Sequence, residues 1–123
     1  MHYSELTLRY FETAAHAGVL VGPDVHRGSA GSRAEGVWVQ FDLRVNTGVI
    51  EEVRFLAFAC PHAIAVSAWV AEHGAGPLLR ALPEGVQGLS DRFAVPVEKR
   101  GRLLTIEDAW LAAVDGALQR SPL

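Results

Sequence analysis

The chain has 123 residues, half of them apolar and about a fifth charged, with a formal net charge of −3 and a single cysteine. This size predicts one domain, residues 1–123, with a substantial core, and the mild negative charge argues against nucleic-acid binding, which usually needs a basic surface. One cysteine excludes an internal disulfide, and no apolar run reaches the roughly 18 residues needed to span a membrane.

The first third of the chain predicts one helix followed by irregular structure. Its polar start is unlike a signal peptide, which together with the unpaired cysteine predicts a cytoplasmic protein. Residues 4–15 carry apolar side chains at helical spacing, with Ser4 as a suitable N-cap. Residues 19–21 are a candidate for a short strand. Residues 22–36 are rich in glycine, serine and alanine, and we expect them to form a long mobile loop.

The strongest periodicity of the chain lies in residues 37–45, VWVQFDLRV. Apolar side chains alternate strictly there with the others, which predicts a half-buried antiparallel strand. Residues 46–48, Asn-Thr-Gly, predict a tight hairpin with Gly48 at a position of positive φ. The returning strand is then expected over residues 49–59, covered on both faces near its end.

The only cysteine lies where this extended segment passes into a helical one. Pro61, directly after Cys60, suits the first turn of a helix because its missing N–H would have no partner there. Residues 61–73 are apolar nearly all round, which predicts a buried helix. Cys60 is therefore either a thiol activated by the free N–H groups and dipole of that helix, or a buried side chain acting as a small hydrophobe.

The C-terminal third predicts helices separated by breaks. Residues 78–82 are expected to form a short helix, residues 86–93 one or two further turns, and residues 95–97 an extended segment. Apolar spacing then predicts a final amphipathic helix that ends near Arg120. The basic cluster at residues 99–102, just before this helix, is either a phosphate or partner site or an ordinary solvated charge run.

Motifs along nearly the whole chain resemble the IscU/NifU N-terminal family of iron–sulfur cluster assembly scaffolds. The most telling motif is Cys60 followed by Ala-Ile-Ala at residues 63–65 and a helix of small residues. Glycines within residues 28–36 precede the strand at 37–45, as the family's glycine-rich loop precedes its strand. Residues 107–109, Glu-Asp-Ala, match the segment that leads into the family's last helix.

This resemblance implies a fold, a function and partners. It implies an α+β fold in which a small three-stranded antiparallel sheet is covered by helices. It implies a scaffold protein, not an enzyme, that assembles iron–sulfur clusters with a cysteine desulfurase and other assembly proteins. The cofactor implied by the family is an iron–sulfur cluster, with iron or zinc as further possibilities and no cofactor as another.

The departures from the family pattern fall on its cluster site. The family uses three cysteines and an assisting aspartate, and only the middle cysteine, Cys60, is present here. Glu35 stands in place of the first cysteine, Val37 in place of the aspartate and Arg102 in place of the last cysteine. The residues expected to line the site, besides Cys60 itself, are therefore Glu35, Val37, His62, Lys99 and Arg102.

These replacements predict a converted site. Iron–sulfur clusters and structural zinc are each normally held by about four ligands, and Cys60 with Glu35 supplies two. Arg102 has no acceptor and stays charged, so it would repel a cation. We expect Glu35 and Arg102 to form an ion pair across the old site; the alternative is that both lie on exposed loops and never meet.

His62 and the function of the site leave several alternatives open. His62 either tunes the thiol, joins a ligand set with His16 or His26, or points into solvent. The chain is then a degenerate scaffold-like protein that works through Cys60, or a non-catalytic interaction or regulatory protein on the same fold. A third alternative is a zinc or iron binder that uses Cys60, Glu35 and histidines.

Overall fold

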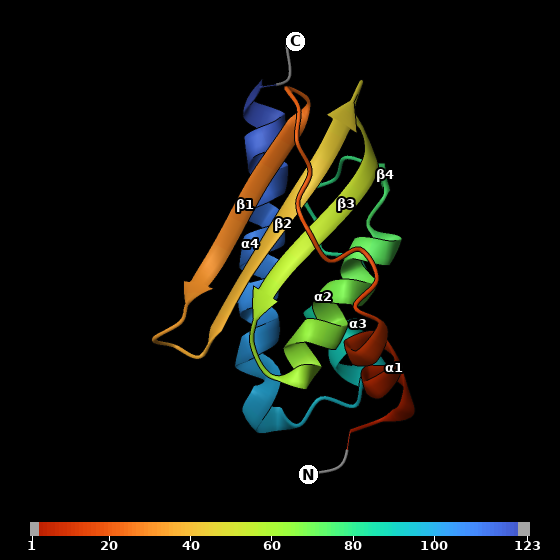
Figure 1. Cartoon of the computed structure of the whole chain (residues 1–123), viewed down its shortest axis with the longest axis vertical. Helices are drawn as coiled ribbons and strands as arrows, with labels where there is room; N and C mark the ends of the chain where they lie inside the picture. Colours follow the sequence, from red (N-terminus) through yellow and green to blue (C-terminus); the bar gives the residue numbers. More distant parts are fainter. Residues whose placement is uncertain (1–2, 121–123) are drawn as a thin grey trace.

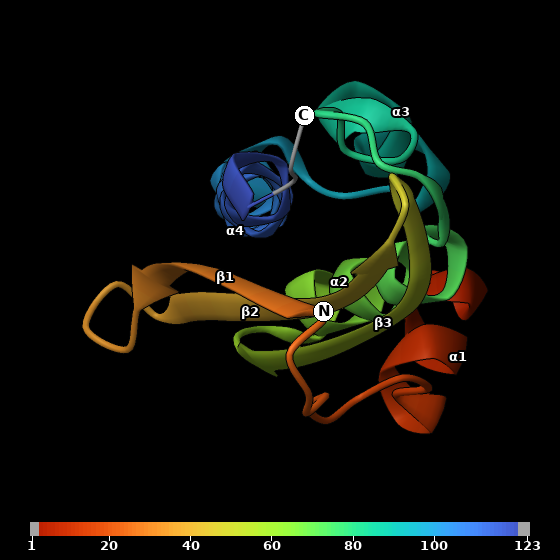
Figure 2. The same ribbon diagram turned by 90° about the horizontal axis from the view of Figure 1, so that it is seen from above.

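The computed structural model describes residues 3–120, which form one antiparallel sheet with helices packed on it (Figure 1). The sheet has four strands in the order β1-β2-β3-β4. Helices α4 and α2 cover one of its faces, and α1 packs against α2 (Figure 2). The elements are α1 (Glu5–Thr13), β1 (Val25–Ser32), β2 (Val37–Asn46), β3 (Val49–Phe58), α2 (Pro61–His73), β4 (Gly76–Pro77), α3 (Gly85–Arg92), the 3₁₀ turn η1 (Val97–Lys99) and α4 (Arg100–Arg120).

The central hairpin of β2 and β3 has the predicted form. The apolar positions of β2 point into the core, and Val39, Phe41 and Leu43 are fully buried. Thr47 and Gly48 both have positive φ, 49° and 75°, as a two-residue type I′ hairpin turn requires. The α+β class and the helices expected at residues 4–15 and 61–73 are also confirmed.

The segment expected to be a long loop contains a strand instead. β1 pairs with β2 along its whole length, and the two-residue β4 pairs with β3, so the sheet has four strands and not three. Its inward positions are small because α4 lies directly against them: a Cβ added at Gly28 would sit 2.1 Å from the backbone nitrogen of Ala113. Gly28 therefore reflects close packing of a helix on a strand, whereas Gly22 and Gly36 lie outside the strand with positive φ. The expectation of a mobile loop over residues 22–36 was wrong.

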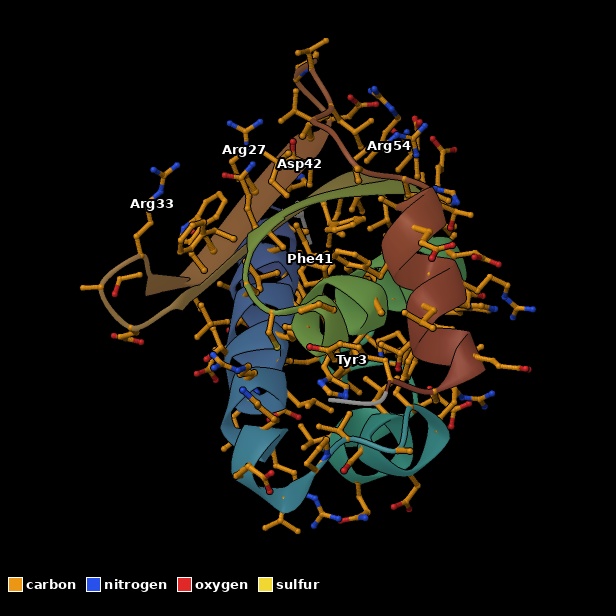
Figure 3. The ribbon with its side chains drawn as sticks, turned by 60° about the horizontal axis from the view of Figure 1, so that its bottom comes forward. Tyr3, Arg27, Arg33, Phe41, Asp42 and Arg54 are labelled. Carbon is orange, nitrogen blue, oxygen red and sulfur yellow. The ribbon has the colours of Figure 1, made fainter. Side chains whose placement is uncertain are left out.

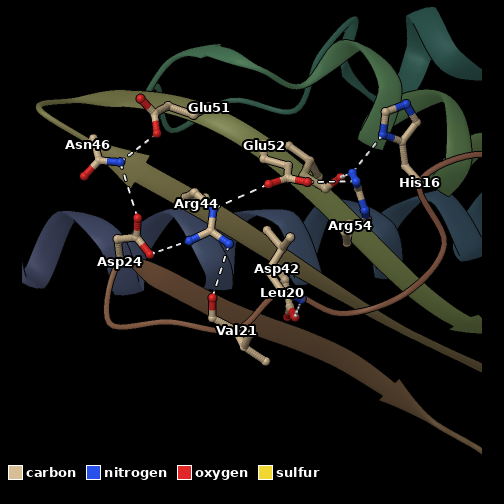
Figure 4. A network of polar contacts seen from close by, with 11 residues as sticks. His16, Leu20, Val21, Asp24, Asp42, Arg44, Asn46, Glu51, Glu52 and Arg54 are labelled. Carbon is tan, nitrogen blue, oxygen red and sulfur yellow. Dashed lines mark hydrogen bonds and ion pairs between the residues drawn. The ribbon is translucent and has the colours of Figure 1, made fainter.

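The short strand expected at residues 19–21 is also absent. This segment crosses the outer face of the sheet, where the N–H of Leu20 donates to the buried Asp42 carboxylate at 2.9 Å. A network of ion pairs and hydrogen bonds fastens the rest of the crossing, with Arg44 bonded to Asp24 at 2.6 Å and His16 to Arg54 at 3.2 Å (Figure 4). These polar side-chain contacts hold the segment together with backbone bonds, an isolated parallel bridge between Ala17 and Phe55 and the bond from the Val45 N–H to the Asp24 carbonyl.

The C-terminal third differs from expectation at two points. Residues 78–82 form no helix, because residues 76–77 pair with β3 as a short edge strand and the chain then runs irregularly to α3. Val97 belongs to η1 and not to an extended segment. α4 begins at Arg100, so most of the basic cluster 99–102 forms the first turn of the last helix. No helix within residues 3–120 combines the length and the apolar character that a membrane span needs.

The core joins the sheet to both long helices. The ring of Phe41 on β2 meets Trp110 of α4 edge to face, with 5.3 Å between the ring centres. α2 is buried along almost its whole length between the sheet and the other helices, as its apolar sequence predicts. This packing places the end of β3, the turn between β1 and β2, and the first turns of α2 and α4 at the same end of the molecule (Figure 1).

Candidate functional site

Cys60 lies at the junction of β3 and α2, where the sequence predicts it. It is the N-cap of α2, with extended φ and ψ of −74° and 165°, and Pro61 follows in the first turn. Its carbonyl accepts the first helical hydrogen bond, from the N–H of Ile64 at 3.1 Å, while its side chain makes no capping bond. The thiol is free and half-buried. The first-turn N–H groups of α2 have no partner within the helix.

His62 is buried beside this thiol and does not point into solvent. Its side chain is only 2% exposed, and its ring lies edge-on to Tyr3, with 4.6 Å between centres (Figure 3). Its Nδ1 atom has no hydrogen-bond partner. Burial, followed by the positive charges of Lys99 and Arg102, lowers the pKa of His62, so the imidazole is neutral at neutral pH. The interpretation of His62 as a solvent-facing side chain was therefore wrong.

Three cations lie at the start of α4, and two of them, Lys99 and Arg102, are close enough to His62 for their charges to act on it. Lys99, Arg100 and Arg102 are all half-buried. None of them takes part in an ion pair in the part of the chain that the structure describes. The Nε atoms of Arg100 and Arg102 are buried without a hydrogen-bond partner. The corner thus combines one thiol, a neutral imidazole and unpaired positive charge.

Glu35 and Val37 do not complete this corner. Glu35 lies exposed in the turn between β1 and β2, where its N–H donates to the Ser32 hydroxyl at 3.1 Å. No ion pair joins it to Arg102 among residues 3–120, so the expected pair was wrong. The turn keeps the Glu35 carboxylate in solvent, where a pair would contribute little. Val37 is 6% exposed and packs in the core on the face towards α4.

The other histidines do not supply the missing ligands. His16 is bonded to Arg54 on the outer face of the sheet, and His26 lies on β1 beside Gly116. Within the described residues, no group of three or more His, Cys, Asp and Glu side chains is placed to hold a metal ion. The predicted ligand set of Cys60, Glu35 and histidines is therefore not assembled, and the donors near Cys60 do not fit an iron–sulfur cluster or zinc.

Sequence reasoning missed one member of the corner, Tyr3, and placed Arg100 only within the basic cluster at residues 99–102. The ring of Tyr3 lies edge-on to the buried His62. Because Arg100 stands four residues after Pro96, the sequence also allows a helix that starts before residue 103. The contact of Tyr3 has no sequence signal, since it depends on how α1 packs on α2.

Comparison with known proteins agrees with this fold. The model of the NifU-like N-terminal domain matches residues 2–84. The chain belongs to the NifU-like N-terminal family. It is 31% identical over 119 residues to the iron–sulfur cluster assembly scaffold protein IscU of Azotobacter vinelandii, covering 93% of this chain and 92% of that protein. It is 30% identical over 118 residues to IscU of Escherichia coli K12, with the same coverage.

Solved structures of this family share the architecture. The N-terminal part of a NifU-like protein from Brucella abortus superposes with a TM-score of 0.75 at 19% identity, covering 96% of this chain and 95% of that one. A putative scaffold protein for the SUF system from Fervidobacterium islandicum AW-1 gives a TM-score of 0.72 at 14% identity, covering 91% and 96%. The resemblance inferred from the Cys60 motif is confirmed for the fold and the family.

Proposed function

We propose that this chain is a scaffold-like protein of iron–sulfur cluster assembly in which Cys60 is the working group and the chain alone holds no complete cluster. Membership of the NifU-like N-terminal family and the scaffold role named for its IscU relatives support the first part. The second part rests on one observation: Cys60 is the only thiol of the chain, and the charges that act on His62, two residues further on, are those of two cations, Lys99 and Arg102.

The residues around Cys60 disfavour the binding of an iron–sulfur cluster by this chain alone. A cluster normally needs about four ligands, mostly thiolates, and one Cys60 leaves the other positions to outside groups. Lys99 and Arg102 carry no acceptor atoms and repel iron by charge. We therefore infer that any cluster handled by this protein is held mainly by a partner.

Cys60 is placed for accepting sulfur. Its thiol is half-buried at the start of α2, and in the thiolate form it can attack the outer sulfur of a partner's persulfide. A new S–S bond then forms at Cys60 while the donor's S–S bond breaks, and the donor leaves as a thiolate. The step exchanges one persulfide for another and needs no external oxidant. A cysteine desulfurase is the kind of partner that presents such a persulfide.

The test is an anaerobic sulfur-transfer assay with a cysteine desulfurase and free cysteine. Intact-mass spectrometry should show one sulfur atom added to the wild-type chain and none added to Cys60→Ser. In parallel, reconstitution with iron and sulfide should leave the chain without a stable visible absorption band. A stoichiometric iron–sulfur chromophore that disappears in Cys60→Ala would contradict the proposal and indicate a conventional scaffold.

One surface favours a second candidate, a non-catalytic interaction protein on this fold. Trp38 and Phe58 are cross-strand neighbours on the outer face of the sheet, and Phe58 is 46% exposed. The Arg33 guanidinium lies 5.3 Å from the centre of the Phe58 ring (Figure 3). An exposed aromatic pair beside the Cys60 corner is typical of a contact surface. Unchanged binding of an assembly protein by Cys60→Ala, without sulfur transfer to the wild type, would favour this candidate.

A further inference from the structure

The first turn of α4 carries charges of the wrong sign for its position. A helix start favours anions, because its free N–H groups and dipole are positive there. α4 is 21 residues long and has no acidic residue in its first turn. Arg100 and Arg102 lie in that turn instead, and Lys99 directly precedes it. Such a departure from the local rule is expected at functional sites.

These cations also lack the partners that other cations of this chain have. Arg27, Arg44 and Arg80 are each within 2.8 Å of a carboxylate oxygen. Arg100 and Arg102 are half-buried with buried Nε atoms that bond to nothing in the described chain. Buried polar atoms in native proteins are nearly always bonded, so each of these two unbonded atoms indicates a missing partner.

The start of α2 also contains polar atoms that have no hydrogen-bond partner. The side chain of Cys60 does not cap the helix, so its first-turn N–H groups have no partner within the helix. His62 in that turn is 2% exposed, with its Nδ1 atom unbonded. Lys99 and Arg102 lie close enough to His62 for their charges to act on its ring. The two cations at the start of α4 and the buried imidazole at the start of α2 thus form one corner, and the thiol of Cys60 lies two residues before that imidazole.

We propose that the Cys60 corner is a binding site for a small oxyanion, a phosphate or carboxylate group, held between the start of α2 and the Lys99 and Arg102 side chains. A guanidinium presents paired N–H donors that match such a group, and unpaired helical N–H groups bind it readily. His62 can donate from Nδ1 in its neutral form. An anion here would satisfy the unbonded atoms and neutralise the charge that keeps metal ions away.

The site would select the reactants that reach Cys60. An anionic reactant is drawn to the thiol, whereas a neutral reactant of the same size gains nothing. The inference does not depend on sulfur transfer, because it requires only that the charges lie beside the thiol. A failure of one proposal therefore leaves the other standing.

The test compares alkylation of Cys60 by iodoacetate, which carries a carboxylate, and by the neutral iodoacetamide. The ratio of the two rate constants cancels the thiolate fraction, which affects both reagents alike. In the native chain this ratio should exceed that of free cysteine by about fivefold or more, as expected for a charge-assisted contact in a half-buried site. Arg102→Gln and, separately, Lys99→Gln should each bring the ratio close to that of free cysteine.

Competition identifies the anion. Inorganic phosphate and acetate are added in turn at constant ionic strength. The ratio of the iodoacetate to the iodoacetamide rate constant is measured at each concentration. Suppression by phosphate supports a phosphate site, and suppression by acetate alone supports a carboxylate site. Arg80→Gln removes the same charge from a distant exposed pair and should leave the ratio unchanged. A ratio equal to that of free cysteine, or one that neither anion lowers, overturns the proposal.

Discussion

Asp42 shows how a single polar residue holds a long irregular segment in place. Its side chain has no exposed surface, and its carboxylate accepts hydrogen bonds from Arg27 at 2.7 and 2.8 Å and from the N–H of Leu20 at 2.9 Å. A buried carboxylate is tolerated only when it is bonded in this way. The residue therefore joins the sheet to the segment that crosses its outer face (Figure 4).

Replacement of Asp42 should destabilise the fold. In Asp42→Asn the charge is lost and one amide NH₂ faces donors, so the free energy of unfolding should fall by about 1–3 kcal/mol. Arg27 is half exposed and can return to water, which limits the loss. The matched control is Asp115→Asn, which breaks the exposed pair with Arg80 and should cost less than about 1 kcal/mol. Equal losses for the two variants in urea denaturation would contradict the argument.

At the scale of elements, the contact between β1 and α4 depends on a glycine. The strand and the helix approach so closely at Gly28 that any Cβ would overlap the backbone at Ala113. This approach pairs the edge strand with the long helix that also carries the Arg100 and Arg102 cations. The same contact explains why a strand here has so little side-chain volume and so weak a sequence pattern.

A methyl group at Gly28 should therefore separate the two elements. We expect Gly28→Ala to lower the free energy of unfolding by about 1–3 kcal/mol or more, because backbone cannot give way as a flexible side chain can. Gly116→Ala on α4 adds the same methyl group where nothing lies within 4 Å. It should instead stabilise the helix by about 0.5–1 kcal/mol. Thermal denaturation followed by circular dichroism should show a lower midpoint for Gly28→Ala and a higher midpoint for Gly116→Ala. A change of the same sign in both variants would indicate a general effect of replacing glycine and would contradict the argument.

At the scale of the whole molecule, one core joins the sheet to the four α-helices that pack around it. Buried side chains from α1, α2, α3, α4 and the sheet belong to a single contiguous cluster. Phe41 lies at its centre, fully buried against Trp110. We infer that the chain folds as one cooperative domain, as its length predicts.

Truncation of Phe41 tests this cooperativity. Phe41→Ala should lower the free energy of unfolding by about 3–5 kcal/mol through lost burial and the cavity left behind. Tryptophan fluorescence and far-ultraviolet circular dichroism should report the same midpoint in the wild type and in the variant. Leu56→Ala, on the outer face of the sheet, should change stability by about 0.5 kcal/mol or less. Separate midpoints for the two signals would indicate two independently unfolding parts.

Much of this fold could be predicted because its signals are local. The alternation of residues 37–45, the Thr47-Gly48 turn and the Cys60-Pro61 helix start each depend on neighbours in the sequence. β1 could not be predicted, because its small residues suit a loop as well as a strand against a helix. The candidate site divides in the same way: the place of Cys60 followed from its motif, whereas the Glu35–Arg102 pair was inferred from charge alone and is not formed.

The sequence by itself determined the family, the α+β class and the position of the thiol at the start of α2, because short motifs and periodicities carry that information. Only the tertiary structure decided what surrounds the thiol. The start of α4 brings Lys99 and Arg102 to His62 from some 40 residues further along the chain, while a turn capped by Ser32 holds Glu35 away in solvent. Packing of α4 on the sheet sets these distances, and no local pattern encodes them.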